Sequence, residues 1–73
     1  MKKECVFKCW AQSEWWYVYK VDFRTFGVRY RVYKGRKWYE HSDFMLLQYA
    51  ICATVNAVTV GMDRCYFMVD GEL

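Results

Sequence analysis

The sequence predicts a small α+β domain in which an antiparallel β-sheet of about four strands packs on one helix and a C-terminal β-hairpin follows. Apolar and polar side chains alternate with a period of two through much of residues 4–40, which is typical of strands. Residues 43–56 instead place apolar side chains at helical spacing. A chain of 73 residues is the size of one domain, so residues 1–73 are assigned to a single binding domain.

The first two strands are predicted at residues 4–11 and 14–23, with a turn at Gln12 and Ser13 between them. In the first strand, alternation groups on one face Cys5, Phe7, Cys9 and Ala11. In the second strand, the side chains expected to face the core are Trp15, Tyr17, Tyr19, Val21 and Phe23. The opposite, solvent-facing set is then Trp16, Val18, Lys20 and Asp22.

The third strand is predicted at residues 26–33, after a turn near Arg24 and Thr25, and the fourth at residues 36–40. Between them, the glycine of the Lys34–Gly35 pair tolerates the positive φ that a tight turn requires. The third strand is expected to direct toward the core Val28, Tyr30 and Val32. Its outward side chains are then Arg29, Arg31 and Tyr33.

A helix is predicted at residues 43–56, with Ser42 or Asp43 as its N-cap, because their oxygens can accept hydrogen bonds from the first-turn amides. Its apolar stripe comprises Phe44, Leu47, Ile51 and Val55. The rest of this helix is also largely apolar, and such a helix is usually covered on two sides. One cover is the sheet. The other is either the final hairpin, predicted at residues 57–61 and 64–69 with a turn at Met62 and Asp63, or a second copy of the chain in a homodimer.

The stretch from residue 44 to residue 62 carries no charged side chain, and a run of 18 or more apolar positions is a candidate membrane span. Polar side chains interrupt it, and residues 55–61 alternate like a strand. We therefore favour a buried helix followed by a strand, and keep a small membrane protein spanning at residues 44–62 as an alternative.

Composition points to a reduced, intracellular setting and to an interface. The first residues lack an uninterrupted apolar run, because Glu4 and Lys8 break it, so no signal peptide is expected. Four cysteines without such a signal indicate free thiols and a cytoplasmic location. A hydrophobic fraction of 56% is high for a free monomer, which predicts a surface that contacts a partner or a second copy.

No residue pattern points to catalysis, a metal or a cofactor. Cys5 and Cys9 lie ~13 Å apart along an extended strand, too far for one disulfide or one zinc ion, so buried and inert thiols are expected. His41 is the only histidine and has no nucleophile signature beside it. The glycines stand singly rather than in a phosphate-binding loop. We therefore expect a protein that is not an enzyme.

The chemistry that stands out is a concentration of rings and cations between residues 15 and 39. This stretch holds ten of the sixteen aromatic residues and seven of the eleven basic ones. The net charge is only +3, but residues 20–37 carry seven positive charges and one negative charge. Arginine can pair with phosphate or carboxylate, and aromatic rings can stack on bases or anchor an interface. The predicted binding residues are Trp16, Lys20, Arg29, Arg31, Tyr33, Lys34, Arg36 and Lys37.

These features predict a non-enzymatic interaction protein whose basic and aromatic sheet face docks on an acidic protein surface or a nucleic-acid-binding complex. Docking would inhibit or regulate that partner, in the manner of small virus- or phage-encoded inhibitors of host and defence machines, such as anti-CRISPR proteins. The alternative is a protein that binds nucleic acid directly, through phosphate contacts and base stacking.

Overall fold

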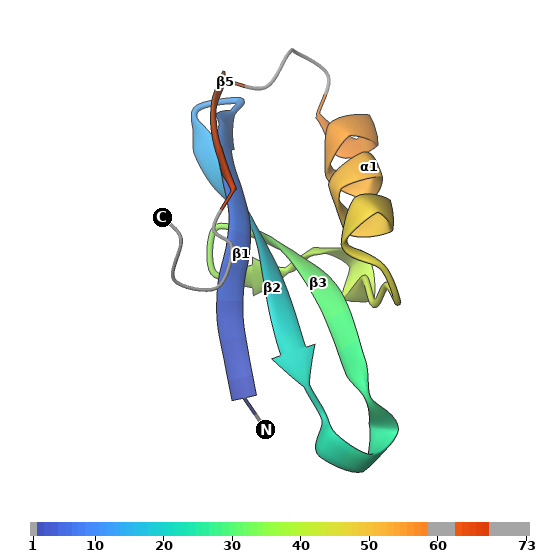
Figure 1. Ribbon diagram of the computed structural model, residues 1–73. Coiled ribbons are helices and arrows are strands. Elements are labelled where there is room, and N and C mark those ends of the chain that lie inside the picture. Colours follow the sequence, from blue (N-terminus) through green and yellow to red (C-terminus); the bar gives the residue numbers. More distant parts are fainter. Residues whose placement is uncertain (1, 59–62, 68–73) are drawn as a thin grey trace.

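The computed structural model describes residues 2–58 and 63–67 and consists of one antiparallel sheet with one helix on one of its faces (Figure 1). The strands are β1 (Lys2–Ala11), β2 (Glu14–Asp22), β3 (Val28–Lys34), β4 (Lys37–Trp38) and β5 (Asp63–Phe67), and the helix is α1 (Leu47–Ala57). The sheet has five strands in the order β4-β3-β2-β1-β5. The predicted α+β class and the antiparallel sheet packed on a helix are therefore confirmed.

β1 and β2 form a hairpin whose turn is Gln12 and Ser13, with φ of 56° and 61°. Positive φ at both central residues is the geometry of a tight hairpin turn that matches the twist of the strands. A bulge interrupts the pairing between Cys5 and Phe7. Because of this bulge, Cys5 lies opposite Tyr19 and Phe7 lies opposite Val18, so the predicted single face through β1 is divided.

The predicted faces of β2 are reversed in the structure. Trp16 is 1% exposed and Val18 is 0% exposed, and both belong to the core under α1. Pairing with Val32 and Cys9, which are also 0% exposed, places them there. Both faces of β2 are apolar enough to be buried, so alternation within this strand cannot choose between them. The neighbouring strands decide, because paired residues share a face of the sheet.

The faces predicted for β3 are correct at Val32, which is buried, and at Tyr30, which packs against the core. The two-residue β4 is shorter than the predicted strand at 36–40, because a 3₁₀ turn begins at Tyr39. The chain then returns to the edge of β3, where Tyr30 and Phe44 exchange backbone hydrogen bonds of 2.7 and 2.8 Å. Between these points, the Ser42 hydroxyl accepts from the Val32 amide at 2.8 Å and donates to the Val32 carbonyl at 3.3 Å.

Ser42→Ala should lower the free energy of unfolding by ~1–3 kcal/mol, because it leaves the half-buried amide of Val32 without its acceptor. Thr25→Ala, a matched loss of a hydroxyl at an exposed position, should change it by less than ~0.5 kcal/mol. Urea denaturation of both variants measures the difference. Equal stability of the two would show that the hydroxyl does not act as a strand partner.

α1 begins four residues later than predicted, at Leu47, and its N-cap residue Leu46 provides no side-chain hydrogen bond. The predicted caps are wrong because the sheet uses both: Ser42 bonds to Val32, and Asp43 pairs with Arg31. The buried helix positions are Ala50 and Thr54. The Thr54 hydroxyl donates to the Ala50 carbonyl at 2.9 Å, so its burial leaves no unpaired donor.

The predicted helix stripe is correct at Leu47 and Ile51, which pack against the core, and wrong at Val55, which is 49% exposed. Phe44 also packs on the core, but from the segment that precedes α1. Other large apolar side chains on this outer side of the helix region are exposed: Met45, Leu46 and Tyr49. No helix among residues 2–58 and 63–67 is long and apolar enough to cross a membrane.

The predicted C-terminal hairpin is not the arrangement that the described residues adopt. Ala57 ends the helix, residues 59–62 and 68–69 lie outside the described residues, and β5 pairs with β1 at the sheet edge. Phe67 lies opposite Phe7, with the ring centroids 4.8 Å apart. β5 thus extends the sheet instead of covering α1, as Figure 1 shows.

Candidate binding face

The face of the sheet opposite α1, here called the outward face, is lined by aromatic and basic side chains. Strand pairing and alternation assign its members. They are Lys3, Cys5, Lys8 and Trp10 of β1; Trp15, Tyr17, Tyr19 and Val21 of β2; Arg29, Arg31 and Tyr33 of β3; Trp38 of β4; and Tyr66 of β5. In β5, the position of Asp63 is paired with Trp10.

Charge is sorted between the two faces of β1, β2 and β3. The acids of these strands, Glu4, Glu14 and Asp22, all occupy positions on the helix side. Each has a cation as its neighbour there: Lys20 lies opposite Glu4, Lys2 lies opposite Asp22, and Lys34 pairs with Glu14 at 3.8 Å. The outward positions of the same strands carry Lys3, Lys8, Arg29 and Arg31 and no acid. The outward face is therefore the positive one.

Lysine ammonium groups on the outward face lie over aromatic rings. The Lys3 ammonium is 4.9 Å from the ring centroid of Tyr19 and 5.0 Å from that of Tyr33. The Lys8 ammonium is 4.9 Å from the ring of Trp15 and 5.5 Å from that of Tyr66. Such contacts contribute ~0.5–1 kcal/mol each at exposed sites and hold the charge near the sheet surface.

Arg31 has a structural role at this face. Its guanidinium lies 4.2 Å from the ring centroid of Trp38 and 5.0 Å from that of Phe23, and it pairs with Asp43 at 3.6 Å. The Trp38 indole in turn donates to the Ser42 carbonyl at 2.6 Å. Arg31 therefore joins β3 to the segment along its edge, and its charge is offset by Asp43.

The structure divides the binding residues predicted from the sequence into two groups. Arg29, Arg31 and Tyr33 lie on the outward face, and Arg36 is exposed in the adjoining turn between β3 and β4. The other four lie on the helix side: Trp16, Lys20, Lys34 and Lys37. Trp16 is a core residue, and the Lys34 ammonium is 5.6 Å from its ring. The reversal of β2 accounts for Trp16 and Lys20, whereas Lys34 and Lys37 face the helix side because of alternation in β3 and its pairing with β4.

The same reversal brings to the outward face residues that the prediction had placed in the core, namely Trp15, Tyr17 and Tyr19. Lys3, Lys8 and Tyr66 join them from β1 and β5, which contain none of the predicted binding residues. The sequence does contain a signal for the exposure of Tyr17 and Tyr19, because a tyrosine hydroxyl needs a hydrogen-bond partner and finds one more easily in water than in a core. Val21, 1% exposed, is the buried residue of this face.

An open hollow of about 320 Å³ lies on the outward face near the β3–β4 turn. Its lining residues, here called the tyrosine hollow, are Lys3, Tyr17, Tyr19, Tyr33, Gly35 and Arg36. Burial raises the pKa of the Tyr19 hydroxyl, and its neighbours Cys5, Tyr17 and Tyr33 add to the effect. The lining of the hollow thus combines aromatic rings with cations and includes no carboxylate.

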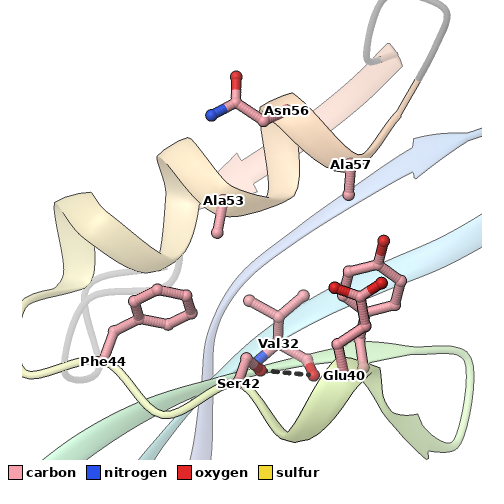
Figure 2. Close-up of a pocket in the computed structure, with 8 residues that line it drawn as sticks. Val32, Glu40, Ser42, Phe44, Ala53, Asn56 and Ala57 are labelled. Atoms are coloured by element: carbon pink, nitrogen blue, oxygen red, sulfur yellow. Dashed lines mark hydrogen bonds between the residues drawn. The ribbon is translucent and has the colours of Figure 1, made fainter.

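Two other hollows lie nearby and differ in chemistry. One, of about 540 Å³, follows the β3–β4 turn and is lined in part by Glu14 and Glu40. The other, of about 360 Å³, lies between the C-terminal half of α1 and residues 39–44 (Figure 2). In Figure 2, Ala53 and Ala57 face this space, whereas the amide of Asn56 points away from it. Because Glu40 contributes a carboxylate to both, neither suits an anion as well as the tyrosine hollow does.

The cysteines, all within the described residues, form no disulfide, and Cys9 and Cys65 lie on neighbouring strands. Cys9 is buried in β1, whereas Cys65 is exposed in β5, the strand beside it. Burial raises the pKa of the Cys9 thiol from 9.0 to about 11, with further contributions from the charge and hydrogen bonding of Cys65. No group of three or more His, Cys, Asp or Glu side chains within residues 2–58 and 63–67 could hold a metal ion.

The raised pKa of Cys9 predicts an alkaline loss of stability. The thiol ionises near pH 9.0 in the unfolded chain and near pH 11 in the folded one, so its stabilising effect is complete below pH 9.0 and declines between these values. The free energy of unfolding should fall less steeply with pH in Cys9→Ala than in the natural chain. Cys5 and Tyr19, whose pKa values are also raised, remain in both proteins, so equal slopes would contradict the assignment to Cys9.

The chain matches none of the known protein families, curated proteins or solved structures with which it was compared. Fold and face together define the class: an α+β protein with one sheet face covered by a helix and the other face basic and aromatic.

Proposed function

We propose that this protein is a non-enzymatic binding protein whose outward face docks on an acidic partner and thereby inhibits or regulates it. The partner is an acidic protein surface or a nucleic-acid-binding complex. The observation that supports this most is the sorting of charge in β1, β2 and β3, where the acids all face the helix side. A face on which these three strands place cations and no acids attracts anionic partners and repels basic ones.

The aromatic content of the outward face supports the same proposal. Trp, Tyr and Arg are the residue types that contribute most to binding energy at interfaces. Trp15 contacts Trp10 edge-on with ring centroids 5.4 Å apart, and the ring centroid of Trp15 is 6.3 Å from that of Tyr66 in β5, beyond β1. These half-buried and exposed rings form a row across the β2–β1–β5 part of the sheet. Such rings are restrained before binding, which lowers the entropic cost of docking.

A small protein with this face can act by occlusion, covering an acidic site that a larger machine needs. Occlusion requires no chemistry from the inhibitor, which agrees with the expectation of a protein that is not an enzyme. The proposed location is the cytoplasm, where reduced thiols such as that of the buried Cys9 persist.

The test is affinity capture from cells of the natural source, with and without nuclease, at low and moderate salt. We expect a stoichiometric partner that survives nuclease at moderate salt, identified by mass spectrometry. A partner that disappears with nuclease would assign the binding to nucleic acid. No retained partner under any of these conditions would contradict the proposal.

Self-association through α1 is a further part of this proposal, because the exposed side chains Leu46, Tyr49 and Val55 carry no charge to repel a second copy. Sedimentation velocity over a range of concentrations should show a dimer that dissociates on dilution. Val55→Glu should give a monomer, whereas Thr25→Glu, with the same charge change in the exposed turn Arg24–Phe26, should still dimerise. A natural chain that is monomeric at every concentration would remove this part of the proposal.

A further inference from the structure

The tyrosine hollow combines three rings from adjacent strands. Tyr17 and Tyr33 are directly opposite each other in β2 and β3, and Tyr19 is two residues along β2 on the same face. The ring centroids of Tyr17 and Tyr19 are 6.1 Å apart, and those of Tyr19 and Tyr33 are 5.2 Å apart at 81°. These distances place the rings in contact with one another, so a flat ligand would lie on the group rather than between its members.

Cations lie over and beside these rings. The Lys3 ammonium is within 5.0 Å of the Tyr33 ring centroid, and Arg36 is exposed in the turn that closes the hollow. Its lining contains no carboxylate, in contrast to the neighbouring hollow with Glu14 and Glu40. Gly35, with φ of 64°, adopts a backbone conformation that suits glycine, and the Glu14 carboxylate lies 3.2 Å from the place where a Cβ would stand.

Rings beside cations match the chemistry of a nucleotide, which joins a flat base to an anionic phosphate. A base stacks on an aromatic face, and lysine or arginine binds the phosphate. A simple anion would use only Lys3 and Arg36 and would leave the three rings without a role. The volume of about 320 Å³ is at the small end of the ~300–1,000 Å³ of ligand pockets, which fits one nucleotide at a time.

We infer that the tyrosine hollow is a base-stacking site for single-stranded nucleic acid, an inference that goes beyond the proposed function because it gives the outward face a nucleic-acid ligand of its own. The strand must be single because the faces of paired bases are stacked inside a duplex. The remaining outward cations, Lys8 and Arg29, then lie where the backbone of the strand can continue.

The decisive comparison uses two fluorescent strands of equal length and charge, an oligothymidylate and an abasic phosphodiester strand without bases. Stacking contributes ~1–3 kcal/mol per base, so fluorescence anisotropy should show the oligothymidylate bound at least ~5-fold tighter. Raising the salt should weaken both strands by the same factor, because the phosphates are identical. Equal affinity for the two strands would overturn the inference, since the binding would then be electrostatic only.

Substitutions in the tyrosine hollow test whether the preference for a strand with bases arises there. Tyr17→Leu should lose the preference for bases, whereas Tyr17→Phe, which keeps the ring, should retain it. Tyr49→Leu, a matched change at the exposed tyrosine of α1 on the other side of the sheet, should bind as the natural chain does. A Tyr17→Leu variant that folds and keeps the preference would place the bases elsewhere and overturn the assignment. If Tyr17→Leu does not fold, the same test applies to Tyr33→Leu and Tyr33→Phe.

Failure of this inference can be told apart from failure of the proposed function. If neither strand binds while a nuclease-resistant acidic protein is captured, the outward face docks on protein and the base-stacking site is wrong. If neither strand binds and no partner is captured, both are wrong. A single thymidine nucleotide that competes with the strand at similar affinity would assign the hollow to free nucleotides, and would also overturn the inference.

Discussion

Trp16→Ala should lower the free energy of unfolding by ~3–5 kcal/mol, which is enough to unfold most of a domain this small. Trp16 is 1% exposed, and its ring meets Tyr39 edge-on with centroids 5.1 Å apart, so its removal leaves a large cavity under α1. Trp15→Ala, one residue earlier on the outward face, should cost clearly less, because Trp15 is only partly buried. Adjacent tryptophans thus give a matched pair that tests which face of β2 is covered.

Urea titration followed by circular dichroism measures the free energy of unfolding of both alanine variants. A third variant, Trp16→Phe, tests the contribution of the indole N–H. The indole N–H of Trp16 is buried without a hydrogen-bond partner among the described residues. Phenylalanine keeps a ring and removes that donor, so Trp16→Phe should cost less than Trp16→Ala. If Trp15→Ala is the more damaging of the two alanine variants, the assignment of the faces is wrong, and so is the outward face built on it.

Reversing the charge of Lys3 and Lys8 together should reduce capture of the acidic partner at least ~10-fold while the domain stays folded. Both residues are on the outward face, where no acid of β1, β2 or β3 offsets them. Their contacts with rings contribute only ~0.5–1 kcal/mol each, so folding should survive the double change. Arg31 is a poor choice for such a variant, because a carboxylate at that position would face Asp43.

The control for this variant is Lys20→Glu with Lys37→Glu, which changes the net charge by the same amount on the helix side. We expect this control to capture the partner almost as well as the natural chain does. Equal losses in both double variants would show that only the overall charge matters. A loss confined to the control would move the binding surface to the helix side and contradict the outward face.

Strand alternation was sufficient for β3, where valines alternate with arginines, and the pattern correctly placed Val32 in the core and Arg29 outside. It failed for β2, where Trp15 and Tyr17 compete with Trp16 and Val18 for the core. A period of two identifies a strand but cannot rank two apolar faces. The outcome depends on pairing with neighbours, which the local sequence of β2 does not contain.

The helix start shows a similar competition. Ser42 and Asp43 are good N-cap residues by type, but each makes a contact with β3 instead: Ser42 bonds to Val32, and Asp43 pairs with Arg31. A propensity for capping is worth ~1 kcal/mol, so two hydrogen bonds and a strand edge can override it. The helix then begins at Leu47, and its buried residues are Ala50 and Thr54.

The sequence by itself determined that this protein is an α+β domain with a positive, ring-rich region, because composition and period are local properties of the chain. Only the tertiary structure decided which rings are core and which are surface. The bulge in β1, the register of β2 with β3 and the pairing of β5 with β1 assign each side chain to a face. Since a shift of one residue exchanges the two faces of a strand, the binding face depends on the pairing of the strands.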